Sequence, residues 1–133
     1  MIENKRIKGH KGFTLMEVLI VIVIMGVLAG LAVPMYKSSV EKSRKAEALA
    51  GLGAVRQSEL RQFAQNGSYT TNLTLLDYDP NSTEGGQTRH FSYAITSASA
   101  TAFVATATRN STNGGDGSST VTINQAGVIG GTF

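Results

Sequence analysis

Residues 11–34 read KGFTLMEVLIVIVIMGVLAGLAVP, and they carry most of the information in this chain. Between Phe13 and Tyr36 the only charged residue is Glu17. As an α-helix with a rise of ~1.5 Å per residue, residues 13–34 would be roughly 33 Å long, which is about the thickness of a hydrocarbon core. The sequence therefore predicts a membrane-spanning helix. A carboxylate in such a helix is costly and is seldom kept without a partner or a function, so Glu17 is the first candidate functional residue.

Charge is concentrated at the start of the chain. Of the 12 Lys and Arg and the 9 Asp and Glu residues, four basic residues and one acidic residue lie in residues 1–12. The rest of the chain carries as many acidic as basic side chains. A basic flank beside an apolar segment is typical of the cytoplasmic side of a membrane helix. A neutral remainder argues against a basic nucleic-acid-binding surface, so no direct nucleic-acid binding is predicted.

The composition excludes several kinds of chemical site. The chain has no cysteine, which excludes disulfides, thiolate metal sites and cysteine nucleophiles. His90 is the only histidine beyond the basic start, and no Ser/His/Asp or paired-carboxylate arrangement can be argued around it. We therefore predict that the chain is not an enzyme.

Beyond Pro34 the pattern becomes amphipathic, which predicts that the helix continues over residues 35–66. Pro34 lacks the N–H that would bond the carbonyl of Gly30, so a kink or a soft spot is expected there. Asn66-Gly67 is a stop signal because both residues tolerate the left-handed conformation that ends helices. Apolar residues recur at roughly helical spacings at Tyr36, Val40, Leu49, Leu52, Leu60 and Phe63.

The remainder, residues 67–133, predicts a loop followed by a small sheet. Alternating apolar and polar residues indicate strands at 90–97, 102–109 and 119–125, and a short last strand is expected to begin at 128–129. An antiparallel sheet of three or four strands packed on the amphipathic half of the helix buries both apolar faces. The predicted fold class is therefore α+β. Its segments are a basic leader (1–12), an apolar helix (13–34), the amphipathic continuation of that helix (35–66) and the sheet domain (67–133).

Residues 11–36 resemble the N-terminal signature of type IV pilins and pilin-like proteins. The resemblance rests on the basic leader that ends in Gly12, on Phe13-Thr14-Leu15-Met16-Glu17-Val18, and on the apolar run that reaches Pro34. The spacing from Phe13 to Glu17 and to Pro34 matches the family. Many type IV pilins close a carboxy-terminal loop with a disulfide, and this chain departs from them because it has no cysteine.

The resemblance implies a processing and assembly route. A prepilin peptidase would cut between Gly12 and Phe13 and methylate the new amino group of Phe13. The subunit would wait as a single-pass protein in the bacterial inner membrane. An assembly platform and its ATPase would then draw it into an extracellular helical filament, a fimbrium made of many copies. Glu17 would pair there with the amine of a neighbouring copy's Phe13, a contact suited to fixing register.

Other features of the apolar segment have assembly interpretations. Gly26 and Gly30, four residues apart, permit close helix approach, although ordinary tolerance of glycine in membrane helices explains them equally well. Pro34 weakens the local hydrogen-bond ladder, so the helix could bend or partly unwind on packing.

Several functions remain open at this point. A pilus filament would serve adhesion, twitching motility or DNA uptake, and a pseudopilin of a type II secretion system is the alternative within the family. Of another class is a secreted soluble binding domain, released by an ordinary signal peptidase after Gly30-Leu31-Ala32. A plain single-span anchor is a further alternative.

No cofactor is predicted, and calcium is a weak candidate. Asn113 with Asp116, or Asp77 with Asp79, could supply oxygen ligands. Their spacing does not fit a twelve-residue calcium loop, and turns are the preferred interpretation.

Overall fold

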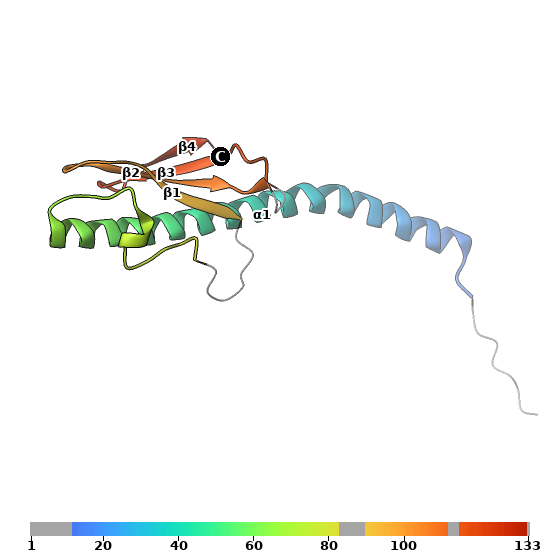
Figure 1. The fold of residues 1–133 in the computed structure, drawn as a ribbon. Helices are drawn as coiled ribbons and strands as arrows, with labels where there is room; N and C mark the ends of the chain where they lie inside the picture. The colour runs from blue at the N-terminus through green and yellow to red at the C-terminus, as the bar shows by residue number, and fades with distance from the viewer. Residues whose placement is uncertain (1–11, 83–89, 112–114, 133) are drawn as a thin grey trace, which may run out of the picture. The chain divides into compact units, whose positions relative to one another are not determined.

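The computed structural model describes residues 12–82, 90–111 and 115–132. It contains one long helix, α1 (Leu15–Asn66), a 3-10 helix, η1 (Leu73–Leu75), and four strands: β1 (Phe91–Ala98), β2 (Phe103–Arg109), β3 (Thr120–Asn124) and β4 (Ile129–Thr132) (Figure 1). The chain divides into an N-terminal unit, residues 1–39, and a C-terminal unit, residues 40–133.

The predicted elements are confirmed. One helix of 52 residues runs through Pro34 without an interruption and ends at Asn66. Gly67, with φ of 72°, takes the left-handed conformation that the stop signal required. The observed strands coincide with the predicted ones to within about two residues at each end.

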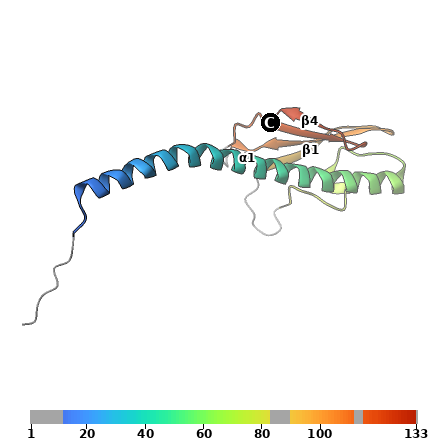
Figure 2. The same cartoon turned by 180° about the vertical axis from the view of Figure 1, so that it is seen from behind.

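In the C-terminal unit, a four-stranded antiparallel sheet lies over residues 40–66 of α1 (Figures 1 and 2). The strand order is β1-β2-β3-β4, so each strand pairs with the next one along the chain. The register is regular except for a bulge in β1, where Ile95 pairs with Ala105 but Ser97 pairs with Val104. Short connections and sequential pairing make this meander the simplest topology for the sequence.

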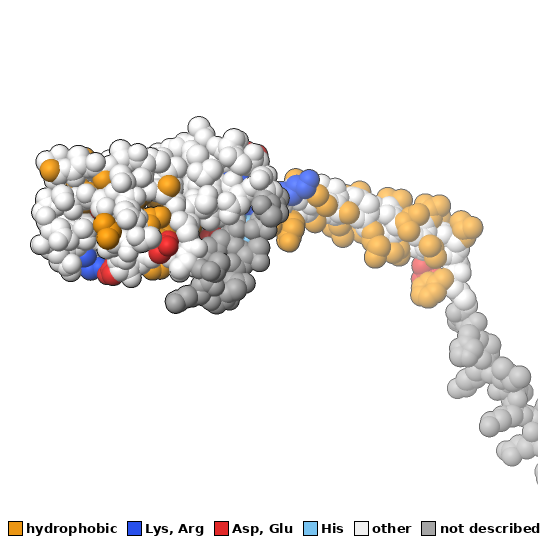
Figure 3. Space-filling model, in the orientation of Figure 1, with side chains coloured by type: hydrophobic (Ala, Val, Ile, Leu, Met, Phe, Trp, Pro, Cys, Tyr) orange, Lys and Arg blue, Asp and Glu red, His pale blue; other side chains and the backbone are white. Residues whose placement is uncertain are grey.

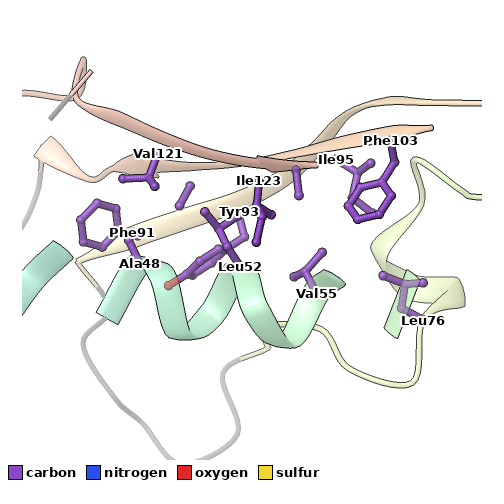
Figure 4. Close-up of a cluster of buried hydrophobic side chains, with 12 residues drawn as sticks. Ala48, Leu52, Val55, Leu76, Phe91, Tyr93, Ile95, Phe103, Val121 and Ile123 are labelled. Carbon is purple, nitrogen blue, oxygen red and sulfur yellow. The ribbon is translucent and has the colours of Figure 1, made fainter. Parts of the chain in front are cut away.

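The core lies between the sheet and α1 (Figure 4). In β1, β2 and β3, alternate residues face the helix and are buried, up to the bulge in β1, as the period of two in the sequence predicted. The buried hydrophobic residues are Ala48, Leu52, Val55, Leu76, Phe91, Tyr93, Ile95, Phe103, Ala105, Ala107, Val121 and Ile123.

The helix face that meets the sheet differs from the predicted apolar stripe. Its buried residues include Ala48, Leu52 and Val55, at spacings of four and three. Of the predicted stripe, Leu52 is fully buried, but Tyr36 is 73% exposed and Phe63 is 38% exposed. Apart from Leu52, the apolar side chains that the helix contributes to this contact are small, and the sheet supplies bulkier ones, including Phe91 and Tyr93.

Gly51 marks a close approach between helix and sheet. A Cβ atom added at Gly51 would collide with the ring of Tyr93. The Tyr93 hydroxyl donates a hydrogen bond to the carbonyl oxygen of Glu47 at 3.2 Å, which fixes the ring against the helix. Gly53, two residues away, has no neighbouring atom within 4 Å of such a Cβ.

Replacing Gly51 with Ala should therefore destabilise the protein, whereas Gly53→Ala should stabilise it. We expect Gly51→Ala to cost about 1–3 kcal/mol, because the Tyr93 ring must move out of a packed core. Gly53→Ala should gain up to about 1 kcal/mol from helix propensity alone. Urea unfolding of the full chain in detergent measures both, and equal gains from the two substitutions would contradict the packing.

The same helix face buries a carboxylate. Glu59 is 0% exposed; its Oε2 accepts a hydrogen bond from the backbone N–H of Thr70 at 3.2 Å, while its Oε1 has no hydrogen-bond partner among the described residues. Burial raises the pKa of Glu59 above its usual value, and the Thr70 N–H opposes that rise. The burial of Glu59 was not predicted from the sequence, since a glutamate in an amphipathic helix is ordinarily solvated.

Stability should consequently fall as pH rises through the folded-state pKa of Glu59. Because that pKa is raised, the folded state binds a proton that the unfolded state has already lost, so the favourable contribution is complete only at acidic pH. Glu59→Gln keeps an acceptor for Thr70 and removes the ionisation. We expect this variant to be more stable at pH 8 by on the order of 1 kcal/mol and to lose most of the advantage at pH 4. An equal effect at both pH values, read from urea midpoints, would refute the buried-charge explanation.

Candidate assembly site

The N-terminal unit has no apolar core of its own. All described residues from Gly12 to Ser39 are exposed, and most of their side chains are hydrophobic (Figure 3). Within the described part of the chain, α1 is the one helix that is long and apolar enough to cross a membrane. An 18-residue window in it has a mean hydropathy of 2.8 and no buried residue. An uncovered surface of this kind requires lipid or other helices around it.

Thr14 begins the helix. Its Oγ1 accepts a hydrogen bond from the backbone N–H of Glu17 at 3.2 Å, and its carbonyl oxygen accepts from the N–H groups of Glu17 and Val18 at 3.1 and 3.3 Å. Thr14 thus occupies the N-cap position, with Glu17 three residues later in the pattern of a capping box. This role was not predicted from the sequence, although the Thr-x-x-Glu spacing before an apolar run indicates it.

The cap fixes where the remaining site residues lie. Gly12 and Phe13 precede the helix in exposed, non-helical chain, and Phe13 is 82% exposed. Glu17 lies in the first turn, where the helix dipole favours a negative charge. Its carboxylate has no hydrogen bond or ion pair to any residue that the structure describes, and the side chains along the helix after it are apolar.

Gly26, Gly30 and Pro34 lie farther along the same helix. A Cβ at either glycine would meet no atom within 4 Å, so both present bare backbone. Pro34 lies inside the span of α1 and is exposed. The structure brings none of these three residues together with Glu17, and their roles in assembly stay predictions.

Carboxylates of the C-terminal unit contrast with Glu17, because several are held by partners inside the chain. Glu41 binds both terminal nitrogens of Arg109 at 3.0 Å. Asp77 binds Arg61 at 2.6 and 2.9 Å, and these bonds lower the pKa of Asp77 to about 2. Glu47 accepts from the backbone N–H of His90 at 3.1 Å and lies 2.9 Å from its ring Nδ1.

The described calcium candidates, Asp77, Asp79 and Asp116, lie outside the helices and strands. Both carboxylate oxygens of Asp116 accept hydrogen bonds from backbone and hydroxyl groups of Ser118 and Ser119, at 2.8–3.1 Å, and these bonds lower the pKa of Asp116. Asp79 accepts from the backbone N–H of Asn81 at 2.8 Å. Asn113 lies outside the described residues. Within residues 12–82, 90–111 and 115–132, no group of three or more His, Asp or Glu side chains is arranged to hold a metal, and calcium stays an untested prediction.

Two family models match this chain. The model described as type IV minor pilin ComP, DNA uptake sequence receptor, matches residues 34–122, which is more than half of the chain. The model of the prokaryotic N-terminal methylation motif matches residues 7–33. Together they cover the apolar helix and most of the C-terminal unit.

Individual relatives agree with these models. The type II secretion system core protein G of Dickeya chrysanthemi is 42% identical over 65 residues, covering 48% of this chain and 42% of that protein. A fimbrial protein of Pseudomonas aeruginosa is 30% identical over 79 residues, covering 58% of this chain and 51% of that protein. The chain thus spans about half the length of the curated relatives it matches.

A solved structure supports the fold. The non-core minor pilin PilV of Neisseria meningitidis superposes with a TM-score of 0.54 at 23% identity, covering 71% of this chain and 88% of that one. The predicted fold class, a long helix packed on a small antiparallel sheet, is confirmed. The chain belongs to the type IV minor pilin family whose model is described as ComP, DNA uptake sequence receptor, and it is a type IV pilin-like subunit with an N-terminal methylation motif.

Proposed function

We propose that this chain is a structural subunit of a type IV pilus-like filament and that its N-terminal helix is the element that polymerises. The observation that carries the proposal is the unpartnered carboxylate of Glu17 on an exposed apolar helix. The pilin family is one of structural subunits, so the function proposed is assembly and not catalysis.

Processing comes first in this proposal. Prepilin peptidase cuts between Gly12 and Phe13 and methylates the new amine of Phe13, while residues 13–33 remain in the inner membrane. Two observations support the assignment: the methylation-motif model matches residues 7–33, and Gly12 and Phe13 are exposed in non-helical chain that a peptidase can bind.

Assembly then depends on one ion pair. A carboxylate at the middle of a membrane helix costs ~2.5–3.5 kcal/mol on insertion scales, and less near the interface. The cationic amine of a neighbouring copy's Phe13 offsets that cost, and the pairing is satisfied at one axial offset between helices. Buried pairs of this kind are better at fixing register than at adding stability.

The remaining helix surface supplies the packing. Gly26 and Gly30 carry no side chain that would keep a second helix away. Pro34 leaves one backbone carbonyl without its helical partner, which makes local bending cheap. A membrane platform and its ATPase provide the work of extension in this proposal.

Replacing Glu17 with Gln should leave processing intact and reduce filament yield. Glutamine keeps the size of the side chain and the Thr14 cap but removes the charge that holds the neighbouring amine. We expect the mature chain to begin at methylated Phe13 by mass spectrometry, while sheared surface filaments fall by roughly tenfold or more, the effect of ~1.4 kcal/mol or more.

Thr14→Val is the matched control, because it removes the cap and retains the charge. It should weaken the helix start by about 1 kcal/mol and change filament yield much less than Glu17→Gln. Wild-type yield from Glu17→Gln, or an equal loss from both variants, would rule out the register role. A mature chain that begins near Val33 would favour the soluble, signal-peptidase-released alternative.

Binding of DNA is a second candidate function, because the matching family model is described as a DNA uptake sequence receptor. This description runs against the prediction of no direct nucleic-acid binding, which rested on a neutral net charge. Three arginines of the C-terminal unit, Arg44, Arg61 and Arg109, pair with carboxylates. Lys42 is exposed, and Arg56 bonds only a neutral carbonyl, that of Gln125, among the contacts described, so these two are the proposed phosphate contacts.

A labelled DNA duplex titrated onto the full chain in detergent tests this candidate. The slope of log affinity against log salt should fall in magnitude by ~2 in the double variant Lys42→Gln, Arg56→Gln, because each phosphate contact contributes about 0.9 to the slope. The control variant Arg61→Gln, Asp77→Asn removes an ion pair without changing net charge and should leave the slope unaltered. Equal slopes in all three proteins would remove Lys42 and Arg56 as contacts.

A further inference from the structure

Two charged residues bound the apolar part of α1. The residues between Glu17 and Lys37, 18–36, include none that is charged. The helix is continuous from one to the other, so at a rise of ~1.5 Å per residue the two positions lie about 30 Å apart along its axis. This separation matches the thickness of a hydrocarbon core. In a bilayer, the helix can therefore have one of these charges at each surface.

The charge of Lys37 is available to a group outside the chain. Lys37 is exposed, and it makes no ion pair or hydrogen bond to any residue that the structure describes. Glu41, the next carboxylate along the helix, is already held by the two terminal nitrogens of Arg109, each at 3.0 Å. The ammonium group of Lys37 can consequently bind an anion of the surroundings.

The residues around Lys37 are typical of a membrane surface. Tyr36 is exposed and ends the apolar run, and the exposed Ser38 and Ser39 follow Lys37. A tyrosine at this level places its ring beside the hydrocarbon and its hydroxyl among the headgroups. A neighbouring lysine lays its aliphatic stem along the apolar surface and keeps its ammonium group at the level of the phosphates. The apolar surface of the helix therefore ends at the pair Tyr36-Lys37.

We infer that Tyr36 and Lys37 bind the phospholipid headgroup layer on one face of the membrane and thereby place Glu17 in the headgroup layer of the other face. The ammonium group of Lys37 contacts lipid phosphates, and the ring of Tyr36 lies at the same depth. The inference rests on the membrane location that the proposed function gives to the unassembled subunit. It does not depend on pairing between copies of the chain.

This depth changes when the charge of Glu17 becomes costly. A span centred on residues 13–34 would lie about 5 Å away along the helix axis and would hold Glu17 within the hydrocarbon. With Glu17 among the headgroups, its carboxylate stays hydrated, and the unassembled subunit avoids the cost of a charge in hydrocarbon. The carboxylate loses its water only when the helix leaves the bilayer for other helices, and it is at that step that it needs a cation.

The depth can be measured with spin labels, because the chain has no cysteine to compete for them. Single cysteines at Met16, Val27 and Ser38 carry the labels, on the full chain in vesicles of phosphatidylethanolamine and phosphatidylglycerol. A water-soluble nickel chelate should reach the labels at Met16 and Ser38, whereas the label at Val27, midway between the two charges, should be protected. Protection at Met16 equal to that at Val27 would overturn the placement, whatever the filament yield of Glu17 variants.

Variants test the role of Lys37 in the same vesicles. Lys37→Leu extends the apolar surface, so the chelate accessibility of the label at Ser38 should fall several-fold. Lys37→Arg should keep the wild-type accessibility, because a guanidinium group also binds phosphate. The matched control Lys42→Leu removes a charge beyond the apolar segment and should leave the label at Ser38 unchanged. Unchanged accessibility in Lys37→Leu, or an equal fall in Lys42→Leu, would overturn the anchor.

Solid-state NMR tests the contact with lipid phosphate. In vesicles prepared in a phosphate-free buffer, lipid phosphorus should dephase a larger share of the lysine ammonium nitrogen signal in the wild-type chain than in Lys37→Gln. Equal dephasing in the two proteins would show that Lys37 does not contact the phosphates, and would overturn the lipid assignment.

Discussion

An apolar helix that its own chain does not cover is the constraint on which the rest of this molecule depends. Burying a large aliphatic side chain stabilises by about 1.5–3 kcal/mol, and the helix from Leu15 to Val33 exposes such side chains on every turn. Nothing in the described chain recovers that free energy. The surroundings must recover it, first as lipid and then, in the proposed filament, as other copies of the helix. Because lipid and neighbouring helices are both apolar, transfer of this helix from one to the other costs little free energy. A polar contact is therefore needed to favour one arrangement of neighbouring helices over another.

Glu17 can select one arrangement of the helices because its carboxylate has no partner among the described residues. In the C-terminal unit, Glu41, Asp77 and Asp116 each have donors within the chain, and even the buried Glu59 holds the backbone of Thr70. The backbone of Glu17 is used to start the helix, but its carboxylate is not used. A charge without an internal partner in an apolar surface favours whatever brings a cation to it.

Local pattern predicted the elements well because their causes are local. The helix length followed from continuous apolar and amphipathic periodicity, its end from Asn66-Gly67, and the strands from alternation. The missed features depend on contacts between distant residues. Gly51 is required by the ring of Tyr93, Glu59 is buried by the chain that follows the helix, and Asn81 protects β1. Thr14 is the exception, since its capping pattern was visible in the sequence.

The unequal edges of the sheet limit what the C-terminal unit can do in a filament. Head-to-tail growth by edge pairing would join β4 of one copy to β1 of the next, and would repeat without end. Asn81 prevents this, because it already satisfies both outward groups of Tyr93 at the centre of β1. One edge of the sheet is thus closed to pairing, and polymerisation is left to the helix in the proposed filament.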